Sequence, residues 1–256
     1  RTVRDTAALF AATERTGADQ EYAPIGLISD PVDRPLRIAF APDPIVAGQV
    51  LDGEVRTAVE DTAAMLEALG HEIIPFTPDI DGEAFALAFN TLWSSAADQF
   101  VRSVKERAGI FPIGMLVEPW TLDLQRFYLA LPEGSLEQAI GILKADAARY
   151  DSWFDRFDVM LTPTLCSPPA RIGEQAPTLD FETLFARVNA FVGYTPVQNA
   201  AEAPAISLPL HWSAGGLPIG SHLTARKGED ALLIALAYQI EQASPWIDRK
   251  PPVWAG

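Results

Sequence analysis

The pattern of apolar and polar positions switches repeatedly between a strand-like and a helix-like period along this chain. Short apolar runs predict buried strands at residues 36–41, 72–76, 158–162, 205–208 and 217–223. Apolar residues at helical spacing, bounded by capping residues, glycine or proline, predict helices at residues 2–17, 55–69, 83–108, 122–130, 135–154, 179–191 and 231–242. Because helices alternate with strands, the pattern predicts an α/β protein with a mixed, largely parallel sheet flanked by helices.

Three local signals sharpen this outline. Thr2 and Asp5 have the spacing of a capping box at the start of the first helix. The strand–helix–strand stretch 36–76 has the length of a βαβ unit, so we expect its strands to pair in parallel with a right-handed crossover. Residues 163–180 hold four prolines and are expected to form a long loop.

The amino-acid composition limits which classes of molecule can bind this protein. The chain has 256 residues, 48% of them hydrophobic, so it can bury a core. Its 19 basic and 34 acidic residues give a net charge of −15, which argues against nucleic acid and against an anionic membrane surface as partners. No apolar run approaches the roughly 20 residues of a membrane span. The single cysteine, Cys166, excludes an internal disulfide and fits a reducing cytoplasm, where we expect the protein to reside.

The histidines do not predict a metal site. His71 follows Gly70 at a helix-to-strand corner and is expected to be exposed, while His211 and His222 belong to the two strands that flank a Gly-Gly turn. The latter two can face each other across that hairpin, but no carboxylate or third ligand accompanies them. We therefore expect structural roles for all three histidines and no metal ion.

Candidate nucleophiles also lack the neighbours that activate them. Cys166 lies in a Pro-rich loop and is expected to be a small buried or loop thiol, because no base or family signature surrounds it. Ser94 and Ser95 fall within a helix and are expected to bond back to its backbone, and Ser207 lies in a strand. Phosphate-binding glycine motifs are missing, so no cofactor is predicted. The residues alone give no complete catalytic set.

A series of motifs, in order, resembles the amidase-signature family of amide-bond hydrolases. They are R-T-V-R-D-T-A-A-L-F at 1–10, L-R-I-A-F-A at 36–41, D-V-M-L-T-P-T at 158–164, N-A-A-E-A-P-A-I-S-L-P from Asn199, G-L-P-I-G at 216–220 and G-E-D-A-L-L at 228–233. The closing motifs are similar to those of bacterial members that act on linear or cyclic amides, including nylon-oligomer hydrolases. The resemblance identifies residues 1–256 as the C-terminal part of a single amidase domain.

The resemblance implies a mechanism whose reactive groups lie elsewhere. Such enzymes use a lysine, a serine in a cis peptide and a nucleophilic serine, all in the family's N-terminal half, and they need no cofactor. The lysines of this chain do not match that context, and no Gly/Ser-rich run is present; the lysines are Lys105, Lys144, Lys227 and Lys250. We therefore assign no catalytic role to any residue of this chain. We expect its partner to be an N-terminal amidase segment or subunit that carries the Ser-Ser-Lys triad. Homo-oligomerisation is a further possibility.

The family's C-terminal half also contributes much of the acyl pocket, and the resemblance points to five substrate-binding candidates. They are Asn90, Trp93, Trp120, Tyr128 (or its neighbour Phe127) and Asn199. Aromatic residues at helical spacing are also typical of an ordinary core. Glu202 and Ala203 stand where the family often has glycine before a proline, and a Glu202 side chain directed into the cleft would alter substrate preference.

Three hypotheses follow. In the first, this chain is part of an amidase, supplies sheet and pocket for a small amide substrate, leaves a large apolar face uncovered and is inactive alone. In the second, it is a non-catalytic module that binds small molecules. In the third, it is a thiol hydrolase that uses Cys166 with His211 or His222.

Overall fold

A single five-stranded mixed sheet organises the molecule. The computed structural model describes residues 2–15, 17 and 21–250. The strands are β1 (Arg37–Phe40), β2 (Glu72–Pro75), β3 (Val159–Pro163), β4 (Ala205–Trp212) and β5 (Pro218–Thr224), in the order β2-β1-β3-β5-β4. β1 pairs in parallel with β2 and β3, whereas β5 pairs antiparallel with β3 and β4. The predicted α/β class with a mixed sheet is confirmed, with parallel pairing in two of these four ladders.

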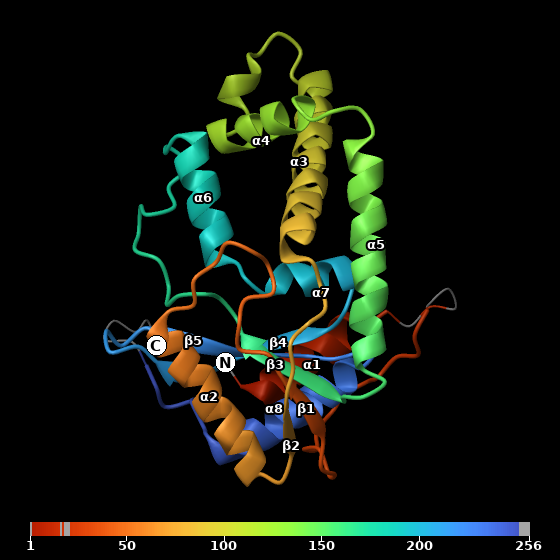
Figure 1. Ribbon diagram of the computed structural model, residues 1–256, viewed down its shortest axis with the longest axis vertical. Helices are drawn as coiled ribbons and strands as arrows, with labels where there is room; N and C mark the ends of the chain where they lie inside the picture. The colour runs from red at the N-terminus through yellow and green to blue at the C-terminus, as the bar shows by residue number, and fades with distance from the viewer. Residues whose placement is uncertain (1, 16, 18–20, 251–256) are drawn as a thin grey trace.

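Helices cover both faces of this sheet. They are α1 (Val3–Thr13), α2 (Gly53–Ala68), α3 (Gly82–Arg107), α4 (Pro119–Leu129), α5 (Ser135–Trp153), α6 (Phe181–Phe191), α7 (Thr195–Ala201) and α8 (Asp230–Ala243), with a short 3-10 turn at Ile113–Met115. Figure 1 shows α3, α4, α5 and α6 rising away from the sheet on one side, while α1, α2 and α8 gather around it at the other end of the molecule. The described helices include none with the length and hydropathy that crossing a bilayer requires.

The side chains of the central strands alternate between two hydrophobic clusters, one on each face of the sheet. Ile38 and Leu161 belong to a cluster with residues of α1, α2 and α8, whereas their strand neighbours Ala39 and Met160 belong to a second cluster with residues of α3, α5 and α7. Successive side chains of a strand point to opposite faces, so each central strand feeds both clusters. Such strands read as continuous apolar runs, which is why they were predictable.

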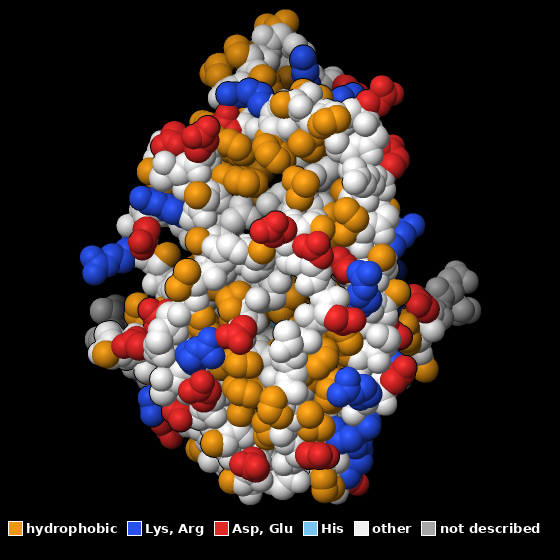
Figure 2. Space-filling model, viewed as in Figure 1, with side chains coloured by type: hydrophobic (Ala, Val, Ile, Leu, Met, Phe, Trp, Pro, Cys, Tyr) orange, Lys and Arg blue, Asp and Glu red, His pale blue; other side chains and the backbone are white. Residues whose placement is uncertain are grey.

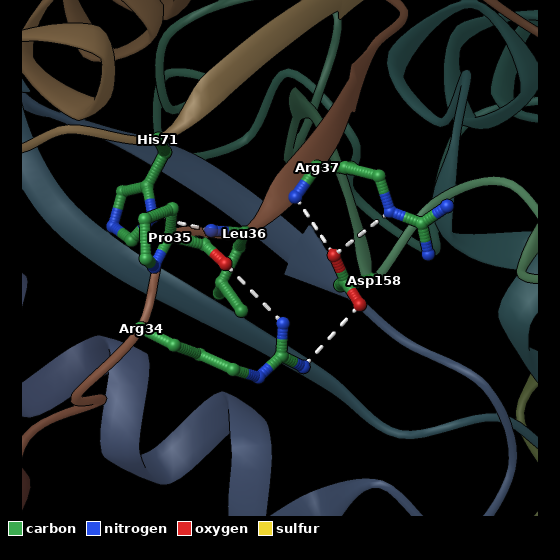
Figure 3. Close-up of polar contacts among 6 residues, drawn as sticks. All are labelled: Arg34, Pro35, Leu36, Arg37, His71 and Asp158. Carbon is green, nitrogen blue, oxygen red and sulfur yellow. Dashed lines mark hydrogen bonds and ion pairs between the residues drawn. The ribbon is translucent and has the colours of Figure 1, made fainter.

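A carboxylate joins the starts of β1 and β3. Asp158 accepts hydrogen bonds from the backbone N–H of Arg37 at 2.7 Å, from its Nε at 3.3 Å, and from Nη2 of Arg34 at 3.3 Å (Figure 3). Burial would raise the pKa of Asp158, but these hydrogen bonds outweigh it and hold the pKa below its ordinary value. The aspartate therefore fixes where the two parallel strands begin relative to each other.

Most predicted element bounds agree with the structure to within a few residues. Thr2 caps α1 by accepting from the backbone N–H of Asp5 at 3.1 Å, although α1 ends at Thr13 and not at Gly17. α4 begins three residues before the predicted start, because Pro119 occupies its first turn, where a missing N–H costs nothing. The pattern did not predict α7, whose seven residues are too few to show a helical period.

The histidine expectations need two corrections. His71 is buried, not exposed: its Nδ1 accepts from the backbone N–H of Leu36 at 3.1 Å (Figure 3), and its Nε2 bonds Oε1 of Gln239 at 2.8 Å. His211 and His222 do not face each other, because His211 lies opposite Ile219 and His222 opposite Ser207 in the β4–β5 ladder.

One edge of the sheet is open. β4 pairs with β5 alone among the described strands, and Ala205 and Ser207 on it are exposed. A groove of about 1130 Å³ runs along this edge, lined by residues of β4, α1 and the segment after α8 that includes Trp246. An uncovered sheet edge is a template for pairing with a further strand.

Candidate functional site

A mostly apolar pocket lies where α3, α6 and α7 meet. Its volume is about 290 Å³, close to the lower end of the range for small-molecule sites. Its lining residues are Val46, Phe85, Ala86, Phe89, Asn90, Trp93, Val188, Asn189, Val192, Thr195, Pro196 and Asn199. Three of the five sequence-predicted residues, Asn90, Trp93 and Asn199, are therefore brought together here.

α3 supplies one wall of this pocket. Asp81 caps its N-terminus by accepting from the backbone N–H groups of Glu83 and Ala84, each at 3.1 Å. A side chain at Gly82 would meet the carbonyl oxygen of Ile45 at 2.6 Å, so the glycine permits the segment before α2 to pack against the start of α3. The helix then presents Phe89, Asn90 and Trp93 to the pocket at positions that share one helical face.

The opposite wall depends on a close approach at Gly193, between α6 and α7. Its carbonyl oxygen accepts from the backbone N–H groups of Ile45 and Val46 at 3.0 and 3.1 Å. A Cβ at this position would fall 2.4 Å from Sγ of Cys166. Only glycine fits this contact, which holds Val192 and Thr195 against the segment that carries Val46.

The polar groups of the pocket are carboxamides linked by hydrogen bonds. Nδ2 of Asn90 donates to Oδ1 of Asn189 at 3.0 Å, and Nδ2 of Asn189 donates to the carbonyl oxygen of Phe185 at 2.8 Å. Nε2 of Gln49 donates to the carbonyl oxygen of Asn189 at 2.9 Å. Asn199 is more exposed, and its Nδ2 donates to the carbonyl oxygen of Thr195 at 2.8 Å. The lining includes no Asp, Glu, Lys, Arg or His among the described residues.

Asn189 is a lining residue that the sequence analysis missed. It lies in F-E-T-L-F-A-R-V-N-A-F, a predicted helix that was considered only as an element. The sequence did contain one signal for Asn189, which is a polar side chain between Val188 and Ala190. An asparagine inside a helix usually has a hydrogen-bond partner for its amide.

Trp120 and Tyr128 lie outside the pocket lining. Trp120 is 6.0 Å from Trp93 between ring centroids and extends the aromatic surface outward to Phe181 and Phe185 of α6, which also contact Phe127. Figure 2 shows apolar side chains gathered on this face of the molecule, below α4 and between α6 and α3. Tyr128 is half-buried and has no ring contact with this cluster, so the neighbour Phe127 fits an aromatic role better.

Glu202 does not enter the pocket. It follows α7 with a φ of 52°, and its carboxylate bonds Nζ of Lys227 at 2.7 Å. That hydrogen bond is the main cause that lowers the pKa of Glu202 and raises that of Lys227. Glu202 thus adopts the left-handed backbone conformation that favours glycine, and its side chain forms an ion pair with Lys227 away from the pocket.

The candidate nucleophiles are not activated. Cys166 is buried, and burial raises the pKa of its thiol to about 11, the opposite of what a thiolate nucleophile needs. Ser94 and Ser95 donate to carbonyl oxygens of their own helix at 3.0 and 2.7 Å. Ser207 bonds the hydroxyl of Thr164 at 2.8 Å.

The histidines offered for the thiol hypothesis are occupied elsewhere. Nδ1 of His222 bonds Oγ1 of Thr162 at 3.0 Å, and Nε2 of His211 bonds Oγ1 of Thr62 at 3.0 Å. Burial lowers the pKa of His222 to about 4. No Cys166–histidine contact exists in the part of the chain that the structure describes, so the described residues do not form the thiol–imidazole pair that the thiol-hydrolase hypothesis requires.

The described residues also give no evidence for a metal-ion site or for a catalytic lysine. Within residues 2–15, 17 and 21–250, no group of three or more His, Cys, Asp or Glu side chains is arranged to hold a metal ion. Lys105, Lys144 and Lys250 are exposed, and the fourth lysine is the ion-paired Lys227.

Comparison with known proteins decides the family. The family model described as Amidase matches residues 1–234. The chain belongs to the amidase family. The protein named "Putative amidase AmiC" of Mycobacterium tuberculosis is 37% identical over 253 residues, which cover 96% of this chain and 51% of that protein. The 6-aminohexanoate-cyclic-dimer hydrolase of Paenarthrobacter ureafaciens is 29% identical, with 98% and 54% covered.

Solved structures confirm the fold of this amidase-family chain. A structure of 6-aminohexanoate cyclic dimer hydrolase matches with a TM-score of 0.85 and 25% identity, covering 98% of this chain and 55% of that one. A bacterial aryl acylamidase of the amidase-signature family matches with a TM-score of 0.74 and 17% identity, which shows the fold alone. The chain thus spans about half the length of the relatives that it matches.

Proposed function

We propose that this chain is the C-terminal portion of an amidase that hydrolyses carbon–nitrogen amide bonds by acyl transfer. It supplies sheet and substrate pocket, while a Ser-cisSer-Lys triad belongs to an N-terminal segment or partner chain. The observation that carries this proposal is the match to the amidase family over residues 1–234 by a chain whose described residues hold an apolar pocket but no activated nucleophile.

In this proposal the chemistry divides between the two halves. The nucleophilic serine attacks the amide carbonyl, the bridging serine and neutral lysine relay its proton to the leaving amine, and backbone N–H groups hold the oxyanion. The pocket of this chain orients the uncharged part of the substrate by burying it against Phe89, Trp93 and Val188. Correct positioning of the carbonyl is worth much of the rate in such reactions.

The open edge of β4 is the proposed contact with the triad-bearing half. The groove along β4 exposes strand backbone beside Ala205 and Ser207 and is lined on its far side by Trp246. A further strand added here would satisfy the edge and bury apolar surface. The half-length match to relatives supports a missing partner of this kind.

The alternative of a non-catalytic binding module rests on a different observation. The twelve residues that line the pocket all belong to this chain, which supports a role in ligand binding for this chain by itself. The two proposals differ in whether amide turnover appears once a triad is supplied.

Turnover by a completed protein tests the proposal. The segment of AmiC that this chain does not match is joined ahead of Thr2, and release of amine from small neutral amides is measured. We expect turnover by the joined protein and none by the chain alone. A Trp93→Ala variant should lower kcat/KM by removing a wall of the pocket. A folded, joined protein that binds amides without hydrolysing any would favour the binding module.

A further inference from the structure

The hydrogen bonds of the pocket fix which way its carboxamides point. A backbone carbonyl oxygen can only accept, so the atom of Asn189 that bonds Phe185 is Nδ2. Oδ1 of Asn189 is then the atom that meets Asn90, and the atom of Asn90 facing it is Nδ2. The orientation of Asn90 is thus set by a backbone group of α6 two hydrogen bonds away.

This chain of bonds leaves an acceptor at the pocket. Oδ1 of Asn90 accepts no hydrogen bond from the described residues, and Asn90 lines the pocket while remaining partly exposed. Asn199 repeats the arrangement, because its Nδ2 donates to the carbonyl oxygen of Thr195 and its Oδ1 likewise lacks a partner in the described part of the chain. Asn199 is exposed, whereas the Oδ1 of Asn90 lies at the pocket, where it is available to a ligand that can donate a hydrogen bond to it.

The rest of the pocket excludes charge. Its walls are the apolar groups of Phe85, Phe89, Trp93, Val188 and Val192, and none of the described residues that line it is ionisable. A charged ligand would lose its hydration there without gaining a counter-ion. The volume of about 290 Å³ suits a small ring or a short chain.

We propose that Asn90, oriented by Asn189, accepts a hydrogen bond from an N–H group of the ligand, and that the pocket thereby selects neutral N–H amides over otherwise similar molecules without the N–H. Asn189 acts as a positioning residue, since its contact with the ligand is not required. This inference rests on the proposed amidase function and specifies the substrate class of the same pocket.

A pair of ligands of equal shape tests this selection. δ-Valerolactam carries a ring N–H, and δ-valerolactone has oxygen in its place. Dissociation constants for both are measured by NMR titration of this chain. We expect the lactam to bind about three- to tenfold more tightly than the lactone, which is the range for one neutral hydrogen bond.

Variants separate the asparagine pair from other causes of that preference. Asn90→Leu removes the acceptor and should bring the ratio of the two dissociation constants close to one. Asn189→Leu should weaken the preference with Asn90 intact, because the amide of Asn90 is then free to turn and presents Oδ1 to the ligand only part of the time. Gln99→Leu makes the same kind of change at an exposed position of α3 outside the pocket and should leave the ratio unchanged.

The outcomes for this inference and for the proposed function are distinct. Equal binding of lactam and lactone by the unaltered chain, no saturable binding of either, or a preference that survives Asn90→Leu would overturn the inference. Hydrolysis by the protein completed with a triad decides the proposed function independently, so a completed enzyme that hydrolyses amides without this preference would retain the function and lose the inference.

Discussion

Single residues show where the sequence was informative and where it was silent. The resemblance pointed to Asn90, Trp93 and Asn199 as substrate-binding candidates, and the fold brings these three residues to one pocket, but Asn189 from another helix was not indicated. His71 follows a glycine at a corner, and nothing nearby in sequence shows that its partners are Leu36 and Gln239. Partners this distant along the chain are set by packing, which local pattern does not contain.

His222 gives a prediction about pH. Its folded pKa of about 4 lies below the ordinary value of 6.5 because burial disfavours the charged ring. Between these values the unfolded chain binds more protons, so stability is complete above pH 6.5 and is lost as the pH falls towards 4. Lowering the pH from 7 to 5 should therefore reduce the free energy of unfolding by about 2 kcal/mol.

Denaturant unfolding at pH 7 and pH 5 checks this prediction. The unaltered chain should lose about 2 kcal/mol more than a His222→Gln variant, which cannot titrate at this position. Gln is chosen because its amide can still donate to Thr162. An equal loss in the two proteins would show that His222 is not the group that titrates.

At the scale of elements, local pattern predicted most helices and strands but not their spatial order. The apolar runs of β1 and β3 marked them as buried, yet their parallel pairing joins residues more than 120 positions apart. Asp158 was noted only as the start of a strand, while the structure shows it bonding Arg34 and Arg37 across that distance (Figure 3). α7 was missed because its length falls below two helical turns.

The hydrogen bonds that Asp158 accepts from Arg34 and Arg37 should contribute to the stability of the fold in a pH-dependent way. Asp158→Asn keeps the shape but removes the charge that three donors share, and we expect a loss of about 1–3 kcal/mol at neutral pH. Because the folded pKa of Asp158 is lowered, its contribution is present above about pH 4 and is lost as the pH falls through the folded value.

Acid titration of unfolding compares the two proteins. The difference in unfolding free energy between Asp158→Asn and the unaltered chain should be largest near pH 7 and shrink below pH 4. An Asp61→Asn variant, which removes an exposed carboxylate of α2, serves as the control. A difference that stays constant with pH would contradict the assignment.

At the scale of the whole molecule, the sheet has two edge strands. β2 forms one edge, while β4 forms the other beside a groove of about 1130 Å³. The sequence resemblance predicts an uncovered apolar face, and the chain spans about half the length of the relatives that it matches. We propose that the open edge of β4 receives the second segment that completes the catalytic site.

Assembly from separate chains tests this claim most directly. The segment of AmiC that this chain does not match is added in increasing amounts, and the rate of amide hydrolysis is followed. We predict no hydrolysis by either chain alone and a rate that saturates near one equivalent. Ala205→Lys, which places a charge on the β4 edge, should weaken assembly, whereas Ala145→Lys on the exposed side of α5 should not. Amide hydrolysis by this chain alone, unchanged by the added segment, would contradict the account.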